Sequence, residues 1–444
     1  MSAGEGETVF EPAPERWAGL VARGPIGGRD REFRRELGLP TGAPVVMSGH
    51  QPILWHPGIL AKWFAMGALA RRVGGSAAWL VAEQDTGDPW TIEAPVSGPA
   101  GPIARRFSLS RSAGANVPFA MQPTVRPRAI ESGSGWAPSS VGDGLERIAR
   151  EVDRHSSAGS ASEQVVLATR GLLGPFGDAP AMVFARALAR TSLFREVLAR
   201  MTKDPGACVK AYNSAVASHP DSGLRTLPAG DDPELPIWRL ADGARRRVTA
   251  RGLQTGPIDN LMPKAILMTG LVRLSACDLF IHGLGGGKYE PAADAWLGEW
   301  LGEKPRAPHV VTSATLRLDF EQPSASAAEV ARLAGAAHRA SNNPRLLGDD
   351  DAAGQKNRLL AAIGGSPRKS RERQEAFAQL RALIQASQIK HSAELERIRE
   401  QSLNARSLRA VASTIDKRTW AFPLYGEPAL SRLKSRIERA FSGS

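Results

Sequence analysis

Two histidines lie close together in one short segment, Gly49-His50-Gln51-Pro52-Ile53-Leu54-Trp55-His56-Pro57-Gly58. Imidazoles change charge near neutral pH, so they can donate hydrogen bonds to phosphate oxygens or transfer protons. The alternative is that glycine, proline and histidine only shape a tight loop. We interpret the segment as functional, with His50 and His56 as catalytic residues and with four binding residues: Gly49, Gln51, Pro52 and Gly58.

A second polar segment, Glu83-Gln84-Asp85, directly follows an apolar run. Carboxylates in such a place can hold a substrate amine, a ribose hydroxyl or Mg²⁺. Most acidic loop residues, by contrast, only cap helices or contact solvent. We assign Asp85 a catalytic role and Glu83 a binding role.

The third segment is rich in glycine and runs His282-Gly283-Leu284-Gly285-Gly286-Gly287-Lys288-Tyr289-Glu290. Successive glycines let backbone N–H groups surround an anion, and a lysine can neutralise it. The spacing before Lys288 differs from a Walker A loop, and Tyr289 stands where serine or threonine is required. We interpret it as a ligand loop whose binding residues are His282, Gly283, Gly285, Gly286, Gly287, Lys288 and Glu290.

The elements around these segments predict an α/β core. Apolar runs at 44–47 and 77–82 read as strands, and the helical pattern between them, 59–73, completes a strand–helix–strand unit. Later, 278–282 reads as a strand and 291–301 as a helix. Ligands bind outside the carboxyl ends of strands in open α/β sheets, so we expect the three segments to share one crevice.

The rest of the chain predicts further helices and one hairpin. Helical patterns cover 141–152, 162–173, 179–201, 210–217 and 263–275, a hairpin covers 238–248, and 309–314 reads as a strand. In the tail, 324–340 and 371–408 look helical, and a heptad pattern breaks at His391. These patterns predict a core in two parts, 1–97 and 256–322, an inserted region, 98–255, and a helical arm with a return segment, 323–444.

Composition narrows the range of functions. The net charge of +12 favours anionic partners, but the arginines are spread along the chain and no zinc-finger spacing is present, so nucleic acid is not favoured. Two cysteines far apart predict neither a disulfide framework nor a metal site, and fit a reducing cytoplasm. We expect no membrane span.

Several further residues have an ordinary structural interpretation. A lysine within a helix is usually exposed to solvent, and we expect this of Lys62 in the helix predicted at 59–73. We likewise expect Arg245-Arg246-Arg247 to form a solvated edge of the hairpin. We expect Cys277 to be buried and to pack against apolar neighbours. His391 is expected on a helix surface.

At the three segments the chain resembles a known family, the bacillithiol biosynthesis cysteine-adding enzymes, which are cysteine ligases. The family has a Gly-Gln-Gln-Pro type loop after its first strand, where this chain has Gly49-His50-Gln51-Pro52. Its next strand ends in an acidic Glu-Asp-His-Asp type sequence, which Glu83-Gln84-Asp85 matches in part. Its late Gly-Gly-Pro-Gly-Glu type loop corresponds in place to His282-Gly283-Leu284-Gly285-Gly286.

The resemblance implies a Rossmann-like parallel-sheet core with inserted connecting segments and a C-terminal α-helical, coiled-coil-like arm. It also implies cysteine-ligase activity. The chain departs from the family at His50, which replaces a glutamine, and at Thr86, which stands where the acidic segment has histidine. The pair His50 and His56 is also similar to the histidines of HIGH-type nucleotidyltransferases, although no Lys-Met-Ser-Lys-Ser-like loop is present.

Three functions therefore stay open. The first is a ligase-like enzyme or nucleotide-dependent transferase that binds a small anionic substrate or nucleotide between the two loops. The second is a non-catalytic ligand-binding or scaffold protein, with a homodimer formed through the helical arm. The third is an adenylyl or nucleotidyl transferase. The residues do not identify a cofactor, and ATP or another nucleotide is the alternative that we retain.

Overall fold

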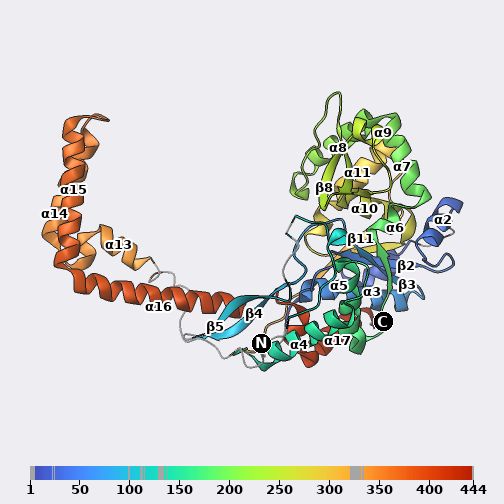
Figure 1. Ribbon diagram of the computed structural model, residues 1–444, viewed down its shortest axis with the longest axis horizontal. Helices are drawn as coiled ribbons and strands as arrows, with labels where there is room; N and C mark the ends of the chain where they lie inside the picture. The colour runs from blue at the N-terminus through green and yellow to red at the C-terminus, as the bar shows by residue number, and fades with distance from the viewer. Residues whose placement is uncertain are drawn as a thin grey trace. The chain divides into compact units, whose positions relative to one another are not determined.

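The computed structural model describes residues 6–22, 24, 26–98, 101–110, 114, 116–128, 135–136, 138–320, 332 and 335–442. The chain forms two compact units. The first comprises residues 1–94, 105–319 and 418–444, and the second comprises 95–104 and 320–417. The predicted mixed α/β class is confirmed (Figure 1).

A six-stranded sheet forms the centre of the first unit. Its strand order is β1-β11-β10-β2-β3-β6. The strands from β11 to β6 are parallel, whereas β1 pairs antiparallel with β11. Their bounds are β1 Thr8–Glu11, β2 Val45–His50, β3 Ser76–Val81, β6 Ala181–Phe184, β10 Leu279–His282 and β11 His309–Ala314.

The predicted strand–helix–strand unit is confirmed as β2, α3 (Pro57–Arg72) and β3. Helix α3 begins at the His56 side chain, which accepts a hydrogen bond from the N–H of Gly58, and Pro57 fits the first turn. Gly74, with a φ of 64°, follows its end. The strand order reverses at β2, because β3 lies on one side of β2 and β10 lies on the other.

Different helices cover the two faces of the six-stranded sheet. Val45 and Met47 of β2 belong to the main apolar core together with α7 (Ser192–Lys203), α8 (Pro205–Ser218), α10 (Ala265–Leu271) and α11 (Glu290–Leu301). Val46 points to the other face, because side chains alternate along a strand. Helix α3 packs there, and α17 (Glu427–Ser442) packs on α3. Figure 1 shows the first group above the strands and α3 below them.

One predicted helix is wrong. The pattern at 179–201 predicts a single helix, but Ala181–Phe184 forms β6 and the helix begins again as α6 (Ala185–Leu188) and α7. Pairing with β3 explains the difference, because the backbone groups of this short apolar run complete the edge of the sheet. The helices predicted at 141–152, 162–173 and 210–217 exist as α4 (Ser139–Arg154), α5 (Ala161–Leu173) and α8, and a further helix, α2 (Gly28–Glu36), precedes β2.

Two smaller sheets accompany the core. The predicted hairpin is confirmed as β7 (Glu234–Ala241) and β8 (Ala244–Thr249), and β9 (Leu261–Pro263) joins it. Strands β4 (Thr91–Gly98) and β5 (Gly101–Ser108) pair in a sheet that the sequence did not predict. The helix predicted at 263–275 is α10 followed by a π-helical turn, η5 (Val272–Ala276).

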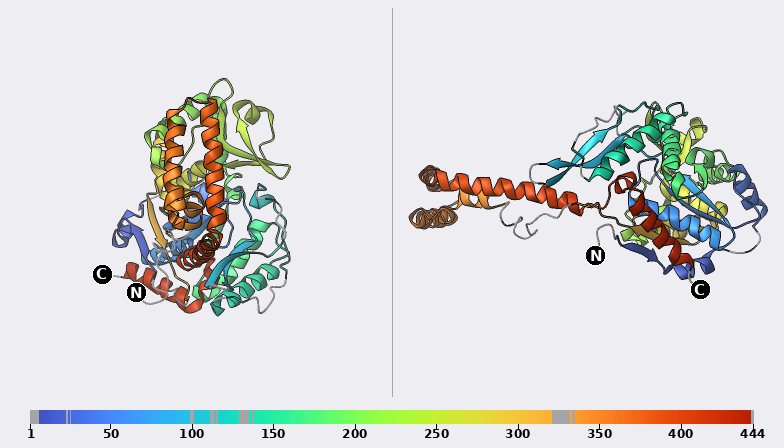
Figure 2. Two further views of the ribbon diagram at one scale, coloured as in Figure 1. Left: turned by 90° about the vertical axis from the view of Figure 1, so that its left-hand side faces the viewer. Right: turned by 90° about the horizontal axis from the view of Figure 1, so that it is seen from below.

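The second unit is mostly helical. Helices α14 (Asp350–Gly365) and α15 (Arg371–Lys390) lie side by side, as Figure 2 shows, and α16 (Ser392–Asp416) follows. The helical stretch predicted at 371–408 is divided at His391, where the heptad pattern breaks. His391 was expected on a helix surface, but it lies between α15 and α16, partly buried, with its Nε2 3.0 Å from Asp349. Much of the helix predicted at 324–340 lies outside the described residues, and α13 covers Ala336–Asn342.

The return segment contains a buried stretch, Trp420–Tyr425, which ends in a short 3-10 helix, η8 (Phe422–Tyr425). Phe422 donates its backbone N–H to the carbonyl of Trp55 over 2.7 Å, which ties the segment to the loop before α3. None of the helices in the described ranges is long and apolar enough to cross a membrane.

A buried ion pair fixes the amino ends of β2 and β10. The Asp278 carboxylate accepts hydrogen bonds from Arg34, at 2.8 Å, and from the N–H of Val45, at 2.7 Å. The side chains of Arg34 and Asp278 are each 2% exposed. Arg306 contacts the other carboxylate oxygen at 2.9 Å, and its side chain is 24% exposed.

We predict that Asp278→Ala lowers the free energy of unfolding by about 3–5 kcal/mol, because the guanidinium of Arg34 stays buried without its partner. Arg306→Gln is the matched control. It removes the more exposed contact to the same carboxylate and should cost about 1 kcal/mol or less. Urea unfolding of both variants measures the difference. Equal losses would contradict the assigned role of the buried pair.

Candidate functional site

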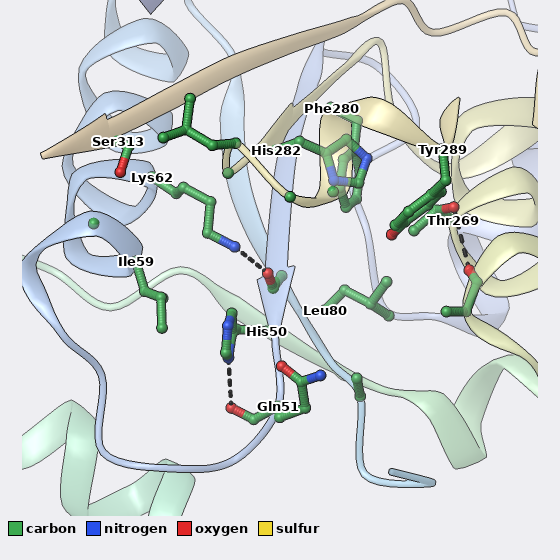
Figure 3. Close-up of a pocket in the computed structure, with 18 of the residues that line it drawn as sticks. His50, Gln51, Ile59, Lys62, Leu80, Thr269, Phe280, His282, Tyr289 and Ser313 are labelled. Carbon is green, nitrogen blue, oxygen red and sulfur yellow. Dashed lines mark hydrogen bonds between the residues drawn. The ribbon is translucent and has the colours of Figure 1, made fainter. Parts of the chain in front are cut away.

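A cavity of about 440 Å³ opens at the carboxyl ends of β2 and β10. The strand order reverses between these two strands. Open α/β sheets bind ligands at such a topological switch point. The walls come from the ends of β2 and β3, from α3, from α10 and from the loop after β10. Figure 3 shows Lys62 and Ile59 of α3 on one side and His282, Tyr289 and Thr269 on the other.

Lys62 is the main correction to the sequence interpretation. Its side chain is buried, not solvated, and its Nζ donates a hydrogen bond to the carbonyl oxygen of Gly49 over 2.5 Å. The indole ring of Trp79 lies 5.2 Å from the same nitrogen. Burial lowers the pKa of Lys62 from 10.5 to about 7, because an ammonium loses its hydration in such a site.

Both histidines of the first segment line the cavity in their neutral form. Burial, and then the charge of Lys62, lowers the pKa of His50 well below its usual value, and lowers the pKa of His56 in the same way. The Nδ1 of His56 accepts a hydrogen bond from the N–H of Gly58 over 3.1 Å. The proton of the neutral ring is therefore on Nε2, which makes His56 a hydrogen-bond donor there.

Asp85 also lines the cavity but is engaged by two neighbours. Gln51 donates to one carboxylate oxygen at 2.9 Å, and Arg245 donates to the other at 2.7 Å. Arg245 stacks on Trp238 at 4.4 Å, so it is held in place and is not a freely solvated hairpin charge. Asp85 thus joins the β2 loop to the β7–β8 hairpin.

Glu83 lies elsewhere. It is fully buried and accepts hydrogen bonds from Ser162, at 2.9 Å, and from the backbone and side chain of Arg186, both at 3.0 Å. The carboxylate holds α5 and α6 against the end of β3. It does not line the cavity described above.

His282, at the end of β10, contacts a buried carboxylate. Its Nε2 lies 2.7 Å from Oε1 of Glu290, although the N–H does not point directly at the oxygen. Arg273 donates to the other oxygen of Glu290 and lies 2.8 Å from Asp294. Burial opposes ionisation of Glu290, but His282, Arg273 and Thr269 outweigh it and lower its pKa to about 2.

The glycine loop approaches His282 closely. A Cβ on Gly286 would lie 2.4 Å from Nδ1 of His282, whereas a Cβ on Gly285 would meet nothing within 4 Å. Gly286 therefore needs to be glycine because the imidazole occupies the space beside it. Tyr289, beyond the loop, is partly buried, and the loss of hydration around its hydroxyl raises the pKa of that group.

The structure brings together most of the residues that the sequence singled out. Those that line the cavity are Gly49, His50, Gln51, His56, Gly58, Asp85, His282, Gly283, Gly285 and Gly286. Five others, Pro52, Glu83, Gly287, Lys288 and Glu290, do not line it. Glu290 is nevertheless connected to it through His282.

The sequence interpretation missed Lys62, Thr269 and Tyr289 as lining residues. A signal for Lys62 was present, because it is the one charged residue between Pro57 and Ala70 in a helix that is apolar on every side. Such helices are buried, and so are their charges. Thr269 carried no comparable signal in its own helix.

Neither a metal site nor a reactive thiol emerges from the described residues. No group of histidine, cysteine, aspartate and glutamate that could hold a metal ion occurs among them. Cys208 and Cys277 are buried free thiols, and burial raises the pKa of each. Thiols of this kind are poor nucleophiles, and the packing role expected for Cys277 agrees with its complete burial.

No protein-family model matches the chain, and no curated protein matches it.

The pKa of Lys62 predicts a specific dependence of stability on pH. Folding lowers the pKa from 10.5 to about 7, so between these values the unfolded chain binds more protons than the folded one. The free energy of unfolding therefore rises with pH in this range. We predict that Lys62→Met is more stable than the wild type at pH 7, and that the gap narrows by up to about 1.4 kcal/mol per pH unit above it.

Urea unfolding at a series of pH values measures this gap. Lys304→Met is the matched control, because Lys304 is exposed and its removal leaves the buried charge in place. The control should follow the wild type at every pH. A constant difference between Lys62→Met and the wild type across the series would show that Lys62 titrates as an ordinary lysine.

Proposed function

We propose that the chain is a ligase-like enzyme that binds a small anionic substrate, or the phosphates of a nucleotide, between the His50 loop and the His282 loop. The observation that carries the proposal is the buried ammonium of Lys62 at the wall of the cavity. Within the described part of the chain its hydrogen-bond partner is a neutral carbonyl oxygen, that of Gly49, and it forms no ion pair there. A buried cation without a carboxylate partner is costly, and an anion in the cavity would supply the missing charge.

Two backbone features support an anion at the same place. Helix α3, with 16 residues, directs its N-terminus at the cavity through His56 and Gly58, which both line it. The positive end of a helix dipole attracts negative charge. On the opposite wall, Gly283, Gly285 and Gly286 allow close approach of a ligand to the backbone. The carboxylate that lines the cavity, Asp85, is already engaged by Arg245.

The neutral histidines suit the stabilisation of charge that develops during a reaction. A neutral imidazole can donate from Nε2 to an oxyanion without adding a second buried cation beside Lys62. Loss of one such donor typically costs about 3 kcal/mol of transition-state stabilisation. In this proposal His56 donates from Nε2 to the developing oxyanion, and Lys62 binds the anionic group. Nδ1 of His50 lies against the carbonyl oxygen of Gln51, so the proton of its neutral ring is on Nδ1 and its Nε2 is an acceptor.

The resemblance to cysteine-adding enzymes belongs to the same proposal. The parallel order of β11, β10, β2, β3 and β6 supports a Rossmann-like core, and the α14–α15 pair supports a coiled-coil-like arm. The buried free thiols of Cys208 and Cys277 support a reducing, cytoplasmic compartment. The substrates implied are cysteine and a sugar–malate conjugate.

Calorimetry with pyrophosphate at pH 6 tests the binding proposal. We predict that the wild type binds and that Lys62→Met binds roughly 10- to 100-fold more weakly, the loss expected for one charge-assisted hydrogen bond. Lys304→Met removes an exposed charge and should bind like the wild type. Equal affinity of all three proteins would contradict an anion site at Lys62.

Mass spectrometry distinguishes an enzyme from a binding protein of the same fold. Wild-type protein incubated with cysteine and a sugar–malate conjugate should yield their condensation product, and His56→Asn should yield much less, because asparagine keeps the helix cap but not the imidazole donor. Binding of pyrophosphate without any product would favour the non-catalytic alternative.

A further inference from the structure

The wall of the cavity opposite Lys62 contains His282, whose surroundings differ from those of His50 and His56. His282 lies at the end of β10, is 5% exposed and lines the cavity. Of the three cavity histidines in the described part of the chain, it is the one that contacts a carboxylate, Glu290. His50 contacts a backbone carbonyl through Nδ1, and His56 uses Nδ1 to cap α3.

Glu290 is itself fixed from behind. It is fully buried, and Arg273 binds its second oxygen. Arg273 also donates to the carbonyl of Ala307 over 3.1 Å and contacts Asp294. The carboxylate therefore stays ionised and cannot turn away from His282, because its position is set by groups on η5 and α11.

We propose that His282 is the proton acceptor of the site, with Glu290 as its positioning residue. This inference rests on the proposed function and adds the group that activates the nucleophile. In the step, the N–H or O–H bond of a bound amine or hydroxyl breaks, and its proton forms a bond to Nδ1 of His282. The electron pair stays on the amine nitrogen or hydroxyl oxygen, which becomes the nucleophile.

The geometry selects which ring nitrogen accepts the proton. Nε2 is the ring nitrogen beside the carboxylate, 2.7 Å from Oε1 of Glu290 although not aligned with it. The negative charge next to Nε2 favours the tautomer that has its proton on Nε2 and its lone pair on Nδ1. When Nδ1 gains a proton, the carboxylate stabilises the resulting imidazolium, as in other carboxylate–histidine pairs.

Other charged groups act on the same ring. Lys62 and Arg273 oppose protonation of His282, burial opposes it more strongly, and Glu290 favours it. The ring of His309, 6.2 Å away, also faces it. The net effect is a lowered pKa for His282, so the ring is neutral and able to accept a proton at pH 7.

Gly286 leaves the space beside Nδ1 free of a side chain. A Cβ at position 286 would lie 2.4 Å from Nδ1, and a Cβ at position 285 would meet nothing within 4 Å. Gly286→Ala should therefore displace or cover the ring nitrogen. Gly285→Ala adds the same methyl group one residue earlier in the loop and should leave it as it is.

Nitrogen-15 NMR of histidine-labelled protein tests the assignment without any substrate. We predict that His282, assigned with His282→Gln, carries its proton on Nε2 at pH 7 and has an unprotonated Nδ1. In Glu290→Gln the titration of Nδ1 should move to lower pH, because the stabilising charge is gone. Asp294→Asn, which removes another partner of Arg273, should leave the titration unchanged and controls for disturbance of the buried cluster.

Carbethoxylation followed by mass spectrometry tests access to Nδ1 and does not depend on Glu290→Gln folding. His282 should react in the wild type and in Gly285→Ala, and at least tenfold more slowly in Gly286→Ala. A proton on Nδ1 at pH 7, or no reaction of His282 in the wild type, would overturn the proposal. Loss of pyrophosphate binding in Lys62→Met tests the proposed function separately, since neither His282 measurement involves an anion.

Discussion

The site depends on the parallel pairing of β2 with β10. The two strands come from distant parts of the chain, yet Val46 pairs with Leu279 and Ser48 with Ile281. The hydroxyl of Ser48 donates to the carbonyl of Ile281 over 2.7 Å in a fully buried position. In this register both strands end at the same level, so the loop at His50 and the loop at His282 form the two walls of one cavity.

At this cavity the ammonium group of Lys62 is buried from water. Lys62 projects from an apolar helix toward the carbonyl of Gly49, beside the ring of Trp79. The cost of burying this charge lowers its pKa and opposes folding. Because this cost is retained at the switch point of the sheet, we propose that the cavity receives negative charge. The buried pair of Arg34 and Asp278, by contrast, is neutral overall and holds the opposite ends of the strands.

Much of this core could be predicted from the sequence, because short apolar runs and glycine-rich turns have local signatures. The β2–α3–β3 unit, β10 and both loops were predicted in this way. The strand Ala181–Phe184 could not be, because its pattern also fits a helix and only pairing with β3 decides between them. Ion pairs between distant residues could not be predicted either. No local pattern in the sequence indicates that Asp85 pairs with Arg245 or that Glu290 pairs with Arg273.

The central claim is that Lys62 is a titrating cation that receives an anion. Carbon-13 NMR of protein labelled at lysine Cε, with the signal assigned by Lys62→Met, measures its pKa directly. Sulfate is a suitable probe because its charge is constant between pH 6 and pH 9. The account predicts a pKa of about 7 in the free protein and a higher pKa when sulfate saturates the cavity. An ordinary lysine pKa that sulfate does not change would contradict it.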